Sequence, residues 1–146
     1  MSDSTRPVLR DAEFLSALLD TLIPPGGNRP MPGAGGIGIE PAVAESLVGD
    51  ANTGANVVAT LEALREQTPA FVSLPAPERA KVVEARASLD AASMRALLRH
   101  VYLAYYQHPT VLAALGEPPR PPFPEGFEIE PTDPELLAAL RRRAGV

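Results

Sequence analysis

Cysteine is missing from this chain of 146 residues. That absence excludes disulfide bridges, metal or iron–sulfur sites built on thiolates, and cysteine nucleophiles. Tryptophan is also absent, and Lys81 is the only lysine, so arginine supplies almost all of the positive charge. With a net charge of −5, the chain has no excess of cations to bind phosphate backbones. We therefore expect no nucleic-acid partner.

Long apolar runs are missing as well. A helix that crosses a bilayer needs about 20 apolar residues. The best stretch, residues 14–23, contains Ser16, Asp20 and Thr21 and stops at Pro24. The residues before it lack the basic and apolar regions of a secretory signal. We expect no membrane insertion and a cytoplasmic location, or a periplasmic one if a leader was removed or the partner carries it.

Helical periodicity dominates what is present. Hydrophobic residues make up 45% of the chain and charged residues 21%, as in ordinary globular proteins, and the length suits one domain. Apolar side chains recur every three or four residues, which is typical of helices with one buried face. These patterns predict helices over residues 11–23, 40–48, 53–66, 75–89, 91–107, 109–115 and 134–143. Asp11, Asp90 and either Thr132 or Asp133 are expected N-caps, and Gly116 is an expected helix end.

Seventeen prolines are concentrated in two regions. Residues 24–39 contain four of them, and residues 117–134 contain seven, which forbid a helix or an interior strand there. We predict an all-α fold, a single-domain bundle of six to seven helices over residues 1–146 with two long proline- and glycine-rich loops. Residues 1–10 are expected to form a flexible N-terminus, and residues 117–133 an extended proline-rich segment.

Two motifs could suggest chemistry. Residues 33–38 match G-x-G-x-x-G, but the Arg29–Pro32 segment before them cannot be the buried strand that a dinucleotide site requires. His100 and His108 are the only histidines, and eight residues on a helix rotate them about 80° apart. With Tyr105 nearby, the cluster His100, Tyr105 and His108 is a weak candidate for a stand-alone enzyme or a metal-binding protein. We otherwise expect no catalytic, cofactor-binding or metal site in this chain.

The helix expected over residues 91–107 is apolar on two sides. One stripe includes Met94, Leu97 and Val101, and the opposite side carries Arg99, Tyr102, Leu103 and Tyr106. Such a helix is either central in its own bundle or half-covered by another molecule. Tyrosine and arginine beside leucine are favoured at the centres of protein interfaces. The predicted partner-binding residues are Arg99, Tyr102, Leu103, Tyr106, Pro119 and Phe123, with the loops 24–39 and 117–131 beside them. A self-associating helical domain is the other interpretation.

Two sequence blocks resemble a known family. The first is Leu18–Pro25, LLDTLIPP, followed by Met31–Gly35, MPGAG. The second is Tyr105–Pro109, YYQHP, followed by Leu115–Gly116 and the proline-rich run to Gly126. In content and order the blocks resemble the gluconate 2-dehydrogenase subunit 3 family, the small (gamma) subunits that accompany bacterial flavin-dependent sugar and alcohol dehydrogenases.

The resemblance implies a non-catalytic accessory subunit without a cofactor of its own. In that family FAD sits in a large glucose–methanol–choline-type oxidoreductase subunit, and electrons often leave through a cytochrome c subunit. The small subunit is thought to act as a chaperone-like partner that helps the large one fold, acquire its cofactor and be exported. Family members commonly carry a twin-arginine signal, whereas Arg6 and Arg10 here are unpaired.

Overall fold

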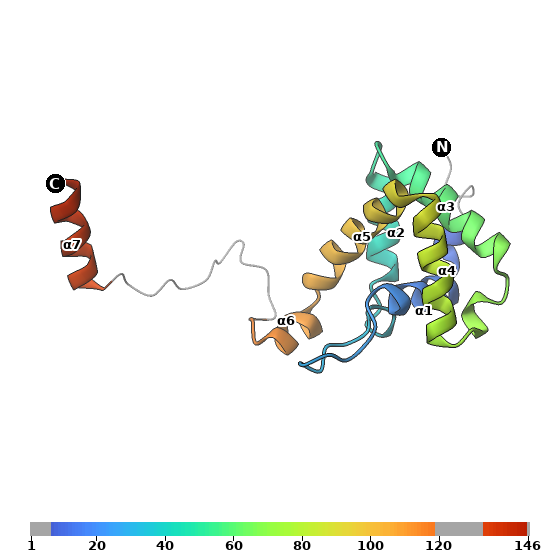
Figure 1. Ribbon diagram of the computed structural model, residues 1–146, viewed down its shortest axis with the longest axis horizontal. Coiled ribbons are helices and arrows are strands. Elements are labelled where there is room, and N and C mark those ends of the chain that lie inside the picture. The colour runs from blue at the N-terminus through green and yellow to red at the C-terminus, as the bar shows by residue number, and fades with distance from the viewer. Residues whose placement is uncertain (1–6, 119–132, 146) are drawn as a thin grey trace.

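The protein is all-α, as predicted. The computed structural model describes residues 7–118 and 133–145 (Figure 1). In these ranges it has seven α-helices: α1 (Ala12–Leu22), α2 (Glu40–Gly49), α3 (Gly54–Gln67), α4 (Ala76–Leu89), α5 (Ala91–Tyr106), α6 (Pro109–Leu115) and α7 (Pro134–Ala144). Three short 3₁₀ helices accompany them: η2 (Pro7–Arg10), η3 (Ala34–Gly36) and η4 (Phe71–Ser73). The expected segment 117–133 falls almost wholly outside the described residues.

The ends of the helices follow local sequence chemistry. The Asp11 carboxylate accepts a hydrogen bond from the Phe14 N–H at 3.0 Å, and Asp90 accepts one from the Ser93 N–H at 3.1 Å. Asp133 caps α7 in the same way. Gly116 ends α6 with φ = +81°, a left-handed conformation that favours glycine. These predicted caps are confirmed because each depends only on residues close in sequence.

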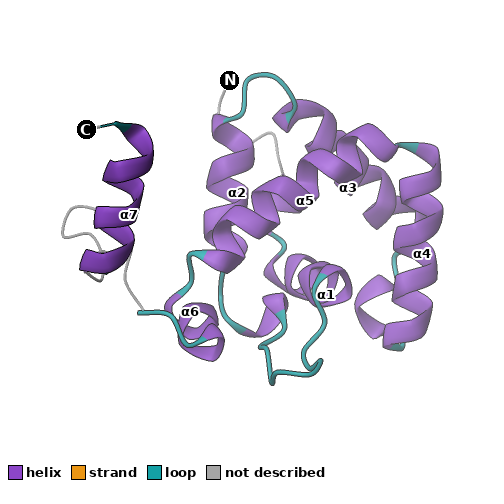
Figure 2. Ribbon diagram, turned by 60° about the vertical axis from the view of Figure 1, so that its left-hand side comes forward, coloured by secondary structure: helices purple, strands orange, loops and turns teal. Residues whose placement is uncertain are grey.

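Helix α5 crosses the body and contacts α2, α3 and α4 (Figure 2). Its buried side packs Leu97 and Val101 into the core, which also contains Leu61 of α3 and Leu47 of α2. Helix α1 covers the core from another side. Its Phe14 ring packs against the Phe71 ring of η4, with the ring centres 5.5 Å apart. One side of α5 is therefore sealed inside the body, which leaves its opposite side as a surface.

Residues 1–10 were expected to form a flexible N-terminus, but residues 7–10 are ordered against the core. Residues 7–10 form η2, and the Val8 side chain is fully buried in contact with the core. Removing one valine side chain from water contributes about 1.5–3 kcal/mol, enough to hold a short turn against α1 and α3. The expectation is wrong for residues 7–10, because the two apolar residues Val8 and Leu9 between Arg6 and Arg10 are too few to show a periodicity. Residues 1–6 lie outside the described part of the chain.

Helix α7 is exposed along its whole described length. It lies apart from the other six helices in both views (Figures 1 and 2). Its apolar side chains Leu136, Leu137 and Leu140 are 54%, 38% and 52% exposed. This amphipathic helix therefore keeps an apolar face that no other described element covers.

Candidate interaction surface

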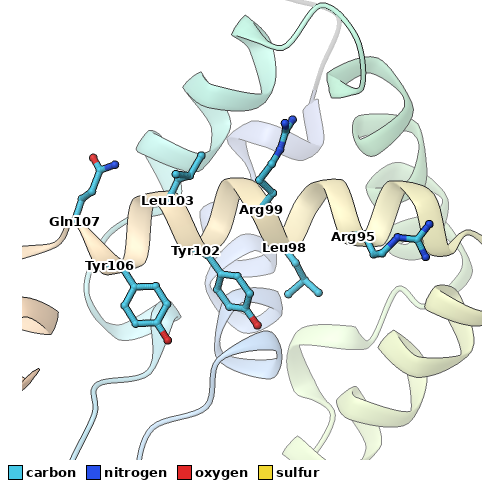
Figure 3. Close-up of a pocket in the computed structure, with 7 residues that line it drawn as sticks. All are labelled: Arg95, Leu98, Arg99, Tyr102, Leu103, Tyr106 and Gln107. Carbon is cyan, nitrogen blue, oxygen red and sulfur yellow. The ribbon is translucent and has the colours of Figure 1, made fainter. Parts of the chain in front are cut away.

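The outer side of α5 forms an apolar groove. Figure 3 shows its lining residues, which come from this helix and its C-cap residue: Arg95, Leu98, Arg99, Tyr102, Leu103, Tyr106 and Gln107. The groove has a volume of about 600 Å³. Tyr102, Leu103 and Tyr106 are 45%, 54% and 50% exposed. All four residues predicted on this side of the helix therefore lie together on one open surface.

The tyrosines of the groove support each other. The rings of Tyr102 and Tyr106 lie 6.0 Å apart, and Tyr106 meets the buried ring of Tyr105 edge-to-face at 5.1 Å. Such aromatic contacts contribute about 0.5–1.5 kcal/mol each beyond simple burial. Tyr105 is itself fixed, since its hydroxyl donates a hydrogen bond to the Pro32 carbonyl at 2.7 Å. The exposed rings are thus held in place before any partner arrives.

Asp50, in the loop between α2 and α3, holds the positively charged Arg99 side chain at the edge of the groove. The Arg99 guanidinium donates to the Asp50 carboxylate at 2.8 Å. The same carboxylate accepts hydrogen bonds from the Thr53 hydroxyl, the Thr53 N–H and the Asn52 N–H. These hydrogen bonds, above all the two from Thr53, hold the pKa of the Asp50 carboxyl well below its usual range. The bonds from Asn52 and His100 lower this pKa further. Arg99 is therefore positioned at the rim of the groove by an ionised partner.

His100 belongs to this Asp50 network and not to the weak candidate cluster. Its Nε2 lies 3.1 Å from the Asp50 carboxylate, and its Nδ1 lies 2.7 Å from the Ser46 hydroxyl. Because a carboxylate only accepts, Nε2 carries a proton that it donates to Asp50, and Nδ1 is paired with the Ser46 hydroxyl. The imidazole is buried, and both nitrogens are occupied in joining α5 to α2. Sequence analysis did not identify Ser46 and Asp50 as partners of His100. They precede it by 54 and 50 residues, a separation over which no local pattern reports a contact.

The other two members of the weak candidate cluster have separate partners. Tyr105 is bound to Pro32, whereas His108 Nδ1 accepts from the Thr110 N–H as the cap of α6. Burial raises the pKa of the Tyr105 hydroxyl, which keeps it protonated and donating. Within residues 7–118 and 133–145, no three His, Asp or Glu side chains lie where they could hold a metal ion together.

The glycine motif packs against α1. The Gly35 N–H donates to the Asp20 carboxylate at 2.9 Å, and the Ser16 hydroxyl donates to the Gly35 carbonyl at 2.7 Å. A β-carbon at Gly35 would lie only 2.1 Å from the Ser16 carbonyl oxygen. Glycine at this position is therefore required for close approach of two backbones, which explains part of the motif without a ligand.

The expected flanking loops have different outcomes. Pro119, Phe123 and most of loop 117–131 lie outside the described residues. Residues 24–30 are exposed, as a contact loop would be. Ala34 and Ile39, however, are buried in the core, so the expectation that all of loop 24–39 forms a contact surface is wrong for this part. Burial removes these two apolar side chains from water, which stabilises the folded state.

Comparison with known proteins adds no relative. The chain matches no family model, no curated protein and no solved structure. By its fold, the described part of the chain is a small all-α protein. It carries an open apolar groove on α5, the longest of the described helices. Among the described helices, none has the length and apolar character needed to cross a bilayer.

Proposed function

We propose that this protein is a non-catalytic accessory subunit, or chaperone-like partner, of a flavin-dependent glucose–methanol–choline-type sugar or alcohol dehydrogenase. In this proposal FAD is bound by the large subunit, a cytochrome c subunit takes the electrons in some complexes, and this chain acts in the cytoplasm or with an exported partner. The resemblance in the Leu18–Pro25 and Tyr105–Pro109 blocks supplies the partner's class.

The observation that carries the proposal is the groove on α5. Of nine large apolar side chains exposed among the described residues, three are Tyr102, Leu103 and Tyr106. Isolated exposed leucines are ordinary on protein surfaces, but grouped aromatic and arginine side chains are typical of interface centres. Since Arg99 is already held by Asp50, a partner would find this surface largely pre-organised, which lowers the entropy cost of binding.

Co-purification with a large flavin-dependent dehydrogenase subunit of the glucose–methanol–choline type from the same organism tests the proposal. We expect wild type to form a complex of defined stoichiometry, and Tyr102→Ala/Tyr106→Ala to lose it. Both side chains are about half exposed, so the double variant should keep its helical circular dichroism and unfold cooperatively. Leu89→Ala, at an exposed apolar position outside the groove, is the matched control and should bind like wild type.

Four outcomes would contradict the proposal. The double variant could bind the dehydrogenase normally, or unfold, in which case its tyrosines serve the fold. The wild type could fail to bind any such subunit. A chain that elutes alone as a stable oligomer, broken up by the tyrosine substitutions, would support the self-associating domain instead.

A further inference from the structure

Two apolar surfaces in the described part of the chain lack a partner, and they account for six of its nine exposed large apolar side chains. One is the α5 groove with Tyr102, Leu103 and Tyr106. The other is the leucine face of α7, formed by Leu136, Leu137 and Leu140. An amphipathic helix laid in an apolar groove is a common mode of recognition, with anchors spaced three and four residues apart. The leucines of α7 have this spacing.

The dimensions of the two surfaces agree. At 1.5 Å per residue, the eleven residues of α7 span about 16 Å. The groove runs along the thirteen residues from Arg95 to Gln107, a distance of about 20 Å on the same basis. Helix α7 therefore fits the groove lengthwise, with its leucines over the section between Leu98 and Tyr106.

Charge selects one direction for α7 in the groove. Its first turn carries Glu135 after the cap Asp133, and its last turn carries Arg141, Arg142 and Arg143. The groove carries Arg95 and Arg99 toward the N-terminal end of α5 and uncharged Gln107 at the other end. A parallel arrangement places the acidic end of α7 beside the two arginines. An antiparallel one would place three arginines beside them, which is unfavourable.

The segment that connects α6 to α7 favours docking of the chain's own α7 over the α7 of a second copy. Seventeen residues, 116–132, separate the end of α6 from Asp133, and α6 directly follows the Gln107 end of the groove. Even an extension well short of the limit of about 50 Å reaches any point of the groove. A tethered helix has a local concentration near the millimolar range, so weak contacts suffice within one chain. A second copy at micromolar concentration has no such advantage.

We propose that α7 docks parallel to α5 in the groove of its own chain and covers it in the absence of a partner. The position of α7 in the structure is then the undocked member of this equilibrium. Resting on the proposed function, one consequence is that the dehydrogenase must displace α7 in order to bind. The C-terminal helix would thus protect an apolar interface and set the affinity for the large subunit.

Disulfide trapping in the isolated full-length chain tests the docking directly. Because the protein has no cysteine, an introduced pair is the only pair. We expect Leu103→Cys/Leu140→Cys to form an intrachain disulfide in a glutathione buffer at least ten times faster than Leu89→Cys/Leu140→Cys. Position 89 is the more exposed partner, so accessibility alone predicts the opposite order. Adding Leu136→Asp and Leu137→Asp should slow the first pair to the rate of the second.

Direction is tested in the same way, at the Gln107 end. Gln107→Cys/Arg142→Cys should close faster than Gln107→Cys/Glu135→Cys, and the reverse order would overturn the parallel arrangement. Equal rates for the Leu103 and Leu89 pairs would overturn docking, and disulfides found only between chains would assign the groove to a second copy. Leu136 and Leu137 lie on an exposed helix, so their substitution by aspartate should leave the body folded. An unchanged circular dichroism spectrum checks this. No dehydrogenase is present, so this result is independent of the proposed function.

Discussion

Asp50 accepts hydrogen bonds both from residues at the start of α3 and from residues of α5, the helix that carries the groove. Asn52 and Thr53 fix the start of α3, while Arg99 and His100 connect the same carboxylate to α5. A carboxylate that accepts several such bonds is strongly favoured in its ionised form. At the scale of single residues, the placement of the groove therefore depends on one charge in a loop.

Asp50→Asn should flatten the acid dependence of stability. Because folding lowers the pKa of Asp50 below 3.8, its ionised form stabilises the native state at neutral pH. That contribution is lost as the pH falls through 3.8 toward the lower folded value. Urea unfolding followed from about pH 5 to about pH 3 should show a steeper decline for wild type than for Asp50→Asn. Parallel declines would contradict this role of the carboxylate.

Gly35→Ala should be strongly destabilising. Its methyl group would lie 2.1 Å from the Ser16 carbonyl oxygen, a backbone atom that cannot move without shifting α1. Overpacking of this kind costs about 1–3 kcal/mol. Gly36→Ala is the matched control, since nothing lies within 4 Å of its β-carbon, and it should leave stability almost unchanged. Thermal or urea unfolding of both variants decides the matter, and equal stability would show that η3 tolerates displacement.

Sequence reasoning at this scale succeeded where a residue acts on its neighbours. The caps Asp11, Asp90 and Gly116 bond within a few positions, so their roles could be predicted. Contacts between distant segments could not. The bonds of Ser46 to His100 and of Gly35 to Ser16 depend on how helices pack, which no local pattern encodes.

At the scale of elements, periodicity located the helices to within one or two residues, the usual uncertainty of helix ends. It missed η2, η3 and η4 because three or four residues are too few to show a repeat. It also identified two apolar sides on α5 and offered two explanations. Which side the protein covers itself is settled only by the positions of α2, α3 and α4.

Tyr105 and Tyr106 allow the two sides of α5 to be compared. Tyr105→Phe removes the hydroxyl that donates to Pro32 inside the body, and we expect a loss of about 1–2 kcal/mol in the free energy of unfolding. Tyr106→Phe, on the exposed side, should leave stability within about 0.5 kcal/mol of wild type. Urea unfolding measures both. Equal losses would mean that the exposed ring is part of the fold.

At the scale of the whole molecule, α1 to α6 bury their apolar faces against one another, while α7 does not. Sequence analysis predicted α7 and its leucine face, but it placed this helix in the bundle without a specific site. Tertiary position requires shape and charge complementarity between distant surfaces. The groove residues Arg99, Tyr102, Leu103 and Tyr106 were predictable because they share one helix.

A chain ending at Thr132, which keeps Pro119 and Phe123 but lacks α7, should bind the dehydrogenase subunit more tightly than the full-length chain. The body should stay folded, with a Tm within about 4 °C, because no α7 side chain belongs to the core. If α7 covers the groove in about 90% of molecules, the observed Kd of the full chain is about tenfold weaker than that of the open groove. Titration calorimetry of both chains measures this ratio, and Leu136→Asp/Leu137→Asp in the full chain should reproduce the truncation. Equal affinities would mean that α7 does not compete for the groove, and a weaker truncated chain would mean that α7 itself contacts the large subunit.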